Sequence, residues 1–477
     1  MSFFDSEFSN EENFDLPQEN IDDELTACKK ILESGYIYDS VERIEDLIQS
    51  CIEVDRYQDA LLLLEKLLDI FPYNSEYWLK KGITLNALFN FSEALLAYEQ
   101  SLSLNPNDIE TLIDKSATEE NLGLYDIAQK SLEKVLNLDP DNDDALFSLG
   151  LLNQRRADLK TAIEYFERVA AKDPEYSEVF YELGFCYENS NQLEKALGSY
   201  DRFLELDPYN PNGWYNRGIV FAKMNKLEES INSYDLAISL RENFSSAWYN
   251  KGNALADLGR LQEAIVCFKK AHEIDKDDET AVYNIANIYE ELDDLPSAIK
   301  YYTESIKIND EYYDAFLSRG YCYDSMGKYQ LALRDFNKAI SLSKDSAEPW
   351  YAKADLEYSL GKVQESVISY KEALRIEPDN YEVWSNLAET YFEIGEWLEA
   401  LRAFDECIRI DPKDAASYYG KAKANFVLSR TQEAIECLKL AFSLNPDIRT
   451  EFEKDYPEIK TSKLFKRLLG ESLDNLN

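Results

Sequence analysis

Histidine is almost absent from this 477-residue sequence, which contains a single one, His272. A single histidine cannot form a metal site or a general-base pair that needs several histidines, and it leaves only one candidate for a catalytic triad. The seven cysteines are widely scattered, and none of them has the CxxC spacing of a zinc or redox site. These absences predict a protein that is not an enzyme and that uses no metal, no cofactor and no small-molecule substrate.

Long apolar runs and an excess of basic side chains are also missing. The longest apolar stretches, such as residues 60–64, are far shorter than the ~20 residues that a membrane-spanning helix requires. The 92 acidic and 50 basic side chains give a net charge of −42, which repels phosphate backbones and anionic lipids. The amino terminus lacks the basic start and apolar core of a secretory signal. We therefore expect a cytoplasmic protein that binds neither nucleic acid nor membranes.

What the sequence does contain is a strict period of 34 residues. Trp214, Trp248, Trp350 and Trp384 are separated by 34 residues or a multiple of 34. A frame that puts them at position four gives twelve repeats over residues 41–448, with Ala or Ser always at position 20 and mostly Gly, Ala or Ser at position eight. Antiparallel helices approach closely only where side chains are small. Positions eight and 20 are therefore predicted to face each other in a helix hairpin.

Residues that end helices recur at two further positions. Position 15 holds Gly, Asn or Asp in nine of the twelve repeats, and these residues tolerate the left-handed backbone that ends a helix. Position 32 holds Pro in eight repeats, and Pro cannot continue a helix because it lacks the amide hydrogen. Glu242, Lys276, Asp310 and Lys344 replace Pro in the other four. Each repeat is thus predicted to contain two helices.

The pattern resembles the tetratricopeptide repeat family, whose repeats carry a large residue at position four, Gly or Ala at eight, Tyr at 11, Ala at 20, an aromatic residue at 24 and Pro at 32. The repeat that begins at residue 177 matches it with Phe180, Gly184, Tyr187, Ala196 and Tyr200. The resemblance implies an all-α fold, a right-handed α-solenoid or superhelix of helix-turn-helix hairpins. It also implies a scaffold for protein–protein interaction.

The two ends of the chain differ from the repeats. Residues 1–40 contain eleven acidic and two basic side chains, which predicts a mostly disordered tail with a capping helix near residues 21–34. Residues 449–477 are predicted to form carboxy-terminal capping helices, because a repeat array must cover its last open surface.

The resemblance also implies where a partner binds. In such solenoids the first helices of the repeats line a concave groove, into which positions two, five, six, nine, 12 and 13 point. Asp or Glu occupies 22 of these positions and basic residues are few, so we expect a protein or peptide partner with neutral to basic segments. Asparagine and tyrosine gather at groove positions in the middle repeats: Asn216, Asn250 and Asn284 at six, Asn253 and Asn287 at nine, and Tyr181, Tyr215, Tyr249 and Tyr283 at five.

A row of side-chain amides can pair with the peptide bonds of an extended guest, since each amide has two donors and two acceptor lone pairs. We interpret the asparagines as such a ladder, solvated when the groove is empty, and the tyrosines as flat surfaces that flank it. The alternative is that these asparagines are ordinary polar surface residues without a role in binding. Similar ladders occur in the repeat arm of enzymes that attach N-acetylglucosamine to intracellular proteins, but the sequence outside the repeats is too short for their catalytic domain. The basic residues of the carboxylate clamp of Hsp70/Hsp90 co-chaperones are missing.

The function predicted from the sequence is an adaptor that holds an extended or helical segment of a partner protein in the groove. The alternatives are a spacer or assembly factor without a groove ligand, and a regulatory arm of a glycosyltransferase supplied in trans.

Overall fold

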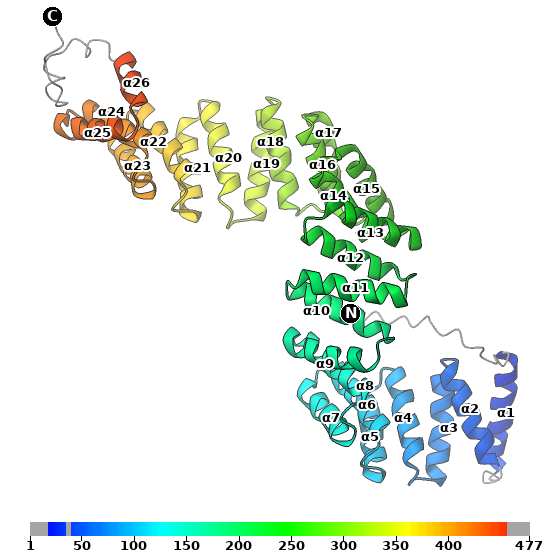
Figure 1. The fold of residues 1–477 in the computed structure, drawn as a ribbon. Helices are drawn as coiled ribbons and strands as arrows, with labels where there is room; N and C mark the ends of the chain where they lie inside the picture. The colour runs from blue at the N-terminus through cyan, green and yellow to red at the C-terminus, as the bar shows by residue number, and fades with distance from the viewer. Residues whose placement is uncertain (1–17, 35–39, 456–477) are drawn as a thin grey trace, which may run out of the picture. The chain divides into compact units, whose positions relative to one another are not determined.

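The chain forms a succession of antiparallel helix hairpins in the computed structural model (Figure 1). The structure describes residues 18–34 and 40–455, and every regular element within these ranges is a helix. This confirms the all-α fold built from helix-turn-helix hairpins. The right-handed superhelix stays a prediction, as does the tail, of which residues 1–17 lie outside the described residues.

The first helix of each repeat covers positions one to 13 of the 34-residue frame, and α20 alone begins one residue later. These helices are α2 (Val41–Glu53), α4 (Ser75–Ala87), α6 (Ile109–Asn121), α8 (Asp143–Arg155), α10 (Ser177–Asn189), α12 (Pro211–Lys223), α14 (Ser245–Asp257), α16 (Glu279–Glu291), α18 (Tyr313–Ser325), α20 (Glu348–Ser359), α22 (Tyr381–Glu393) and α24 (Ala415–Val427).

The second helix of each repeat covers positions 17 to 30 without exception. These helices are α3 (Tyr57–Ile70), α5 (Phe91–Leu104), α7 (Tyr125–Leu138), α9 (Leu159–Lys172), α11 (Leu193–Leu206), α13 (Leu227–Leu240), α15 (Leu261–Ile274), α17 (Leu295–Ile308), α19 (Tyr329–Leu342), α21 (Val363–Ile376), α23 (Trp397–Ile410) and α25 (Thr431–Leu444).

Many first helices begin at a side-chain cap, which the last position of the preceding repeat supplies. Asn74 precedes α4, and its side-chain oxygen accepts hydrogen bonds from the backbone amides of Glu76 and Tyr77 at 2.9 and 3.3 Å. Such a cap satisfies amide groups that have no partner inside the helix and typically contributes ~1 kcal/mol. The same role is played by Asp108, Asn142, Asn210, Asp278, Asn380 and Asp414.

A left-handed residue at position 15, two residues beyond the last helical residue, terminates every first helix. The amide of the following residue then donates to the carbonyl of position 11, as Arg56 does to Cys51 at 2.7 Å and Arg260 to Leu255 at 2.8 Å. This six-to-one bond is the mark of a Schellman turn. Three repeats make the turn with residues that the sequence pattern did not single out: Phe89 at φ 60°, Ala157 at 61° and Ser429 at 61°.

A left-handed backbone costs a residue with a β-carbon ~1–2 kcal/mol. We therefore expect Ala157→Gly to raise the free energy of unfolding by ~0.5–1 kcal/mol. Glycine relieves the backbone strain, but it also raises the conformational entropy of the unfolded chain, which offsets part of the stabilisation. Ala157 is exposed, so no packing is lost. The converse change, Gly123→Ala, should destabilise, since a β-carbon there meets nothing within 4 Å and only the backbone responds. Urea titration measures both. A less stable Ala157→Gly variant would contradict the strain argument.

In the six hairpins with Gly at position eight, a ring at position 24 packs on the bare backbone of that glycine. A β-carbon added to Gly150 would lie 2.3 Å from Cε1 of Phe166, and the same overlap occurs between Gly218 and Tyr234 at 2.6 Å. Position 20 lies close as well, since the hydroxyl of Ser230 donates to the carbonyl of Gly218 at 2.8 Å. The sequence predicted that position eight faces position 20, but where position eight is Gly its closest contact is the ring at position 24.

The repeats without a ring at position 24 support this packing rule. Where Leu replaces the ring, position eight carries a side chain: Ile48 with Leu64, Ser116 with Leu132, and Ala422 with Leu438. Ile48 and Leu64 are both buried in one cluster. In the first repeat Ile48 thus fills the volume that the missing ring leaves, whereas Ala at position eight also occurs beside a ring, as in Ala286 with Tyr302.

This exchange of volume predicts a double-mutant result. Gly150→Ile should overpack the hairpin of α8 and α9 and destabilise by ~3 kcal/mol. Phe166→Leu should recover part of that loss, so that the double variant is more stable than the sum of the two single changes predicts. Thermal unfolding of the four proteins gives the coupling energy. Strict additivity would show that the two positions do not share a packing site.

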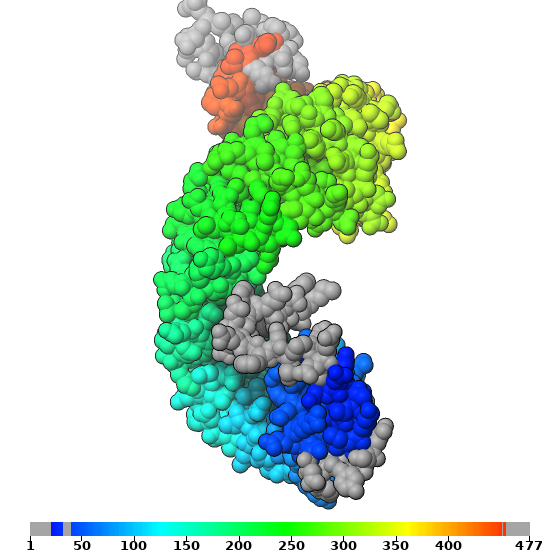
Figure 2. Space-filling model, turned by 90° about the vertical axis from the view of Figure 1, so that its right-hand side faces the viewer, coloured from blue at the N-terminus to red at the C-terminus, as the bar shows by residue number. Residues whose placement is uncertain are grey.

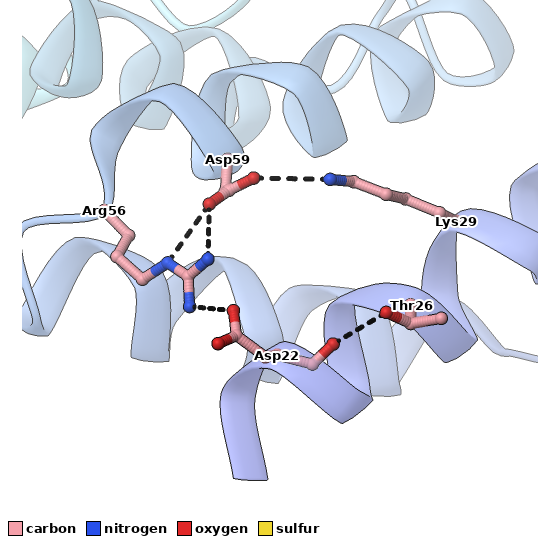
Figure 3. Close-up of polar contacts among 5 residues, drawn as sticks. All are labelled: Asp22, Thr26, Lys29, Arg56 and Asp59. Carbon is pink, nitrogen blue, oxygen red and sulfur yellow. Dashed lines mark hydrogen bonds and ion pairs between the residues drawn. The ribbon is translucent and has the colours of Figure 1, made fainter. Parts of the chain in front are cut away.

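Helix α1 (Gln18–Ser34) covers the first repeat. Ile21, Leu25 and Cys28 are almost fully buried in the same cluster as Leu47 and Leu64. Figure 3 shows polar contacts at its edge. The guanidinium of Arg56 pairs with Asp22 at 2.6 Å and also with Asp59, and Asp59 in turn pairs with Lys29. Exposed ion pairs contribute ~0–1 kcal/mol each, whereas each buried Ile or Leu contributes ~1.5–3 kcal/mol. The apolar face therefore holds α1, and the ion pairs fix its orientation.

The last repeat is covered by α26 (Asp447–Asp455). Phe452 is 2% exposed and contacts the rings of Tyr419 and Phe442, with centroid distances of 6.2 and 5.7 Å. The remaining predicted carboxy-terminal capping segment, residues 456–477, lies outside the described residues.

The chain divides into two compact units, residues 1–240 and 241–477. The first contains the repeats from α2 to α13 and the second those from α14 to α25. In the amino-terminal unit the hairpins pack on one another in chain order, as the colour sequence in Figure 2 shows. Among the described helices, none has the length and apolar character to span a bilayer.

Candidate partner-binding face

Hydrogen bonds between repeats align the first helices side by side. Gln154 on α8 donates to the carboxylate of Glu182 on α10 at 2.7 Å, and Arg155 donates to Glu120 on α6 at 2.8 Å. These residues occupy positions six, 12 and 13, three of those that the family resemblance assigns to the groove. We call the surface formed by positions two, five, six, nine, 12 and 13 the first-helix face of each unit.

Asn284, the last of the three predicted ladder residues, uses its amide hydrogens within the protein. Its Nδ2 donates to the hydroxyl of Tyr249 at 3.0 Å and to Oδ1 of Asn253 at 3.3 Å, both on the preceding first helix. The expectation of a freely solvated amide is therefore wrong for Asn284. Its donors bind neighbouring repeats together, which leaves its carbonyl oxygen as the group available to a guest.

The same arrangement occurs at Asn386, a residue that was not among the predicted ladder residues. Asn386 donates to the hydroxyl of Tyr351 at 3.1 Å and to Asp355 at 3.2 Å. Asn216 likewise hydrogen-bonds Tyr181. The signal was present in the sequence, because each pair is a Tyr at position five followed 35 residues later by an Asn at position six.

The remaining predicted asparagines have separate surroundings. Asn287 accepts a hydrogen bond from the buried Tyr302 at 2.7 Å, and Asn250 is half-buried on α14. Asn216 belongs to the amino-terminal unit, whereas Asn250 and Asn284 belong to the carboxy-terminal unit. A continuous ladder through all three therefore stays a prediction.

The tyrosines at position five are core residues as much as surface residues. Each ring packs on the position-24 ring of its own repeat, with centroid distances of 6.0 Å for Tyr181 and 5.6 Å for Tyr283. Tyr215 and Tyr249 do the same at 5.9 and 5.5 Å. Burial raises the pKa of Tyr181 and Tyr283. The four rings are half-buried, and the hydroxyls of Tyr249 and Tyr283 reach the next repeat, so the flat surfaces beside the ladder stay a prediction.

The carboxylates of the face fall into two classes. Glu120 and Glu188 at position 12 are paired with basic residues at position 13 of the next repeat, Arg155 and Lys223, at 2.8 and 2.9 Å. The Asp114 carboxylate at position six has no ion pair or hydrogen bond among the described residues. Burial, together with nearby Glu110 and Asp108, raises the pKa of Asp114 to about 6.

The Asp114 carboxyl should make stability depend on pH. Its folded-state pKa lies above the ~3.9 of an unfolded chain, so the folded state holds the proton longer and loses stability as pH rises from about 4 to 6. Asp114→Asn should therefore raise the melting temperature at pH 7.5, and the gain should vanish below about pH 4. Glu99→Gln, which removes an exposed carboxylate from the preceding repeat, serves as the control. A gain for Asp114→Asn that persisted at pH 3.5 would contradict this origin.

The repeat geometry is that of a helical hairpin solenoid, and the family profiles agree. Profiles described as Tetratricopeptide repeat match residues 75–108, 118–174, 155–215, 199–232, 245–278, 280–312, 313–346, 381–414 and 415–448, and one described as TPR repeat matches 354–395. The chain is a member of the tetratricopeptide repeat family. Tetratricopeptide domains generally mediate protein–protein interactions.

Comparison with curated proteins finds no match. Solved structures that are similar include YrrB, described as a TPR protein with an unusual peptide-binding site, at 21% identity and a TM-score of 0.36 over 39% of this chain and 97% of that one. The carboxy-terminal part of a TPR repeat-containing protein from Cytophaga hutchinsonii has 18% identity and a TM-score of 0.45 over 50% and 98%. A tetratricopeptide repeat protein from Parabacteroides merdae has 21% identity and a TM-score of 0.37 over 55% and 97%.

Proposed function

We propose that this protein is a non-catalytic scaffold that binds a segment of a partner protein on the first-helix face of its repeats. The observation that carries the proposal is the set of hydrogen bonds between neighbouring first helices, such as Asn284 to Asn253 and Gln154 to Glu182. They hold polar side chains of successive repeats in one register. A guest chain that runs across the repeats meets similar chemistry at regular intervals.

The free groups on this face are mainly acceptors. Both amide hydrogens of Asn284 are used, so its oxygen is the atom that can accept from a guest N–H group. Carboxylates such as Asp114 add further acceptors with negative charge. Peptide N–H groups and Lys or Arg side chains supply the complementary donors. The chemistry therefore supports a neutral to basic segment and works against an acidic one.

All seven cysteines are free and buried, which fits a reducing compartment. We propose a cytoplasmic location on this basis. A protein–protein scaffold in that compartment needs no metal or disulfide, because the stacked hairpins supply the stability.

The ladder is tested by replacing Asn216, Asn250 and Asn284 by Ala in the full chain. A hydrogen bond contributes ~0.5–1.5 kcal/mol net, so losing three should weaken partner binding about ten-fold to two-thousand-fold. The partner is first captured from lysate of the source cells with the wild-type chain and then titrated calorimetrically against the variants. Some loss of stability is also expected, because Asn284 binds two neighbouring residues.

Two controls separate binding from stability. Tyr249→Phe removes the hydroxyl that Asn284 contacts but leaves the amide, so it should lower the melting temperature without abolishing binding. Substituting Ala for the exposed Lys226, Glu228 and Glu229 changes a surface away from the first helices and should leave partner binding unchanged. If the asparagine triple variant binds the partner as well as this exposed triple variant does, the ladder has no part in recognition. A chain that captures no partner behaves as a spacer.

A further inference from the structure

Position nine of the first helices differs between the two units. In the amino-terminal unit, five consecutive repeats carry apolar residues there: Ile83, Ala117, Leu151, Phe185 and Ile219. In the carboxy-terminal unit the same position is polar throughout: Asn253, Asn287, Tyr321, Asp355, Glu389 and Lys423. We call the first set the apolar row.

The apolar row is only partly covered by the protein itself. Phe185 is 41% exposed, Ala117 is exposed, and Ile83, Leu151 and Ile219 are half-buried. Isolated exposed apolar residues are common on protein surfaces. Five at the same position of consecutive repeats form a regular stripe instead, because the hairpins of this unit stack in one register. An apolar stripe framed by polar residues is typical of an interaction surface.

One border of the stripe carries two carboxylates that form no salt bridge within the part of the chain that the structure describes. Position six lies one turn before position nine on the same helix face, and it holds Asp114 and Glu182. The carboxylate of Asp114 lacks a partner among the described residues, and its neighbour Lys115 pairs with Glu119 instead. Burial beside other acids raises the pKa of Asp114, which is the environment that an incoming cation would relieve. Lys80, the one basic residue at position six of this unit, is paired with Glu76 at 3.1 Å.

The other border is electrically balanced. Glu120 and Glu188 at position 12 are already paired with Arg155 and Lys223. A complementary guest therefore has an apolar stripe with basic residues concentrated along one side of it. Such one-sided patterning is natural for an amphipathic helix.

We propose that the first-helix face of the amino-terminal unit binds a basic amphipathic helix of a partner protein, with its apolar stripe on Phe185 and its neighbours and its basic side on Asp114 and Glu182. This inference rests on the proposed scaffold function and names the chemistry of the partner. Packed helices lie ~8–10 Å apart, and seven residues of a helix span ~10.5 Å. An apolar residue in each heptad of the guest therefore meets one repeat after another.

The carboxy-terminal unit does not offer this surface. Its position-nine side chains take part in the protein's own hydrogen bonds, since Asn253 accepts from Asn284, Asn287 from Tyr302, and Asp355 from Tyr370. The polar row of this unit thus serves as an internal control for the apolar row of the other.

The test uses the full chain and a designed peptide of three heptads, with Leu at the stripe positions and Lys along one side. Two further peptides carry Glu in place of Lys or the same residues in scrambled order. We expect the Lys peptide to bind at least tenfold more tightly than either. Phe185→Ser together with Asp114→Asn should weaken its binding at least tenfold. The control pair, Leu96→Ser with Glu99→Gln, removes one exposed Leu and one exposed carboxylate from a second helix and should change binding less than twofold.

Several results would overturn the proposal. Equal binding of the scrambled peptide would show general charge attraction, and undiminished binding of a peptide whose helix is broken by central prolines would identify an extended guest. A dimer that dissociates on Phe185→Ser would identify a second copy of this chain as the occupant. With the captured cellular partner, loss of binding by Asn250→Ala and Asn284→Ala but not by the Phe185 variant would refute this inference while the scaffold function stands. Retained binding by both sets would refute both.

Discussion

The packing of the position-24 side chain against position eight determines the geometry of the hairpin, most tightly in the six repeats with Gly at position eight. Phe166 lies where a β-carbon of Gly150 would be, and Tyr200 and Tyr234 stand in the same relation to Gly184 and Gly218. Because protein interiors are close-packed, this contact fixes how near the two helices of a hairpin come. The distance then repeats every 34 residues, which is why the first helices keep one register along a unit. The first-helix face is a consequence of that register.

Turns and caps maintain the register but tolerate more variation. Position 15 is left-handed in all twelve repeats, even where Phe89, Ala157 or Ser429 must adopt it at a cost. The bond from position 16 to position 11 and the packing of the hairpin outweigh that cost, since a few kcal/mol of buried apolar surface exceed ~1–2 kcal/mol of backbone strain. Position 32 is similar, because α15, α17 and α19 end at position 30 although Lys276, Asp310 and Lys344 follow in place of Pro. The fold thus depends on packing first and on local propensity second.

Much of this architecture is predictable from the sequence, because small residues, left-handed residues and prolines at a fixed period each have one structural meaning. The two helix intervals follow directly from the breaks at positions 15 and 32. The surface was harder to predict. Asn284 and Tyr249 were predicted to lie on one face, but their mutual hydrogen bond joins different repeats, 35 residues apart in the sequence. The inward packing of Tyr181 was missed because a position number states which face a residue occupies and not how its side chain turns.

Under the proposed scaffold function, the same face both holds the stack together and contacts a guest. At positions five, six and 12, residues such as Tyr249, Asn284 and Glu120 bond to neighbouring repeats, so changing them alters the stability of the stack. In the amino-terminal unit, position nine is different. Phe185 is 41% exposed and, as an apolar side chain, makes no hydrogen bond to the next repeat. A substitution of Phe185 should therefore cost the stack less than one of Ile83 or Leu151, which pack against buried clusters. Under the proposed helix binding, Phe185 is thus the residue at which the surface can change while the hairpins beneath it stay the same.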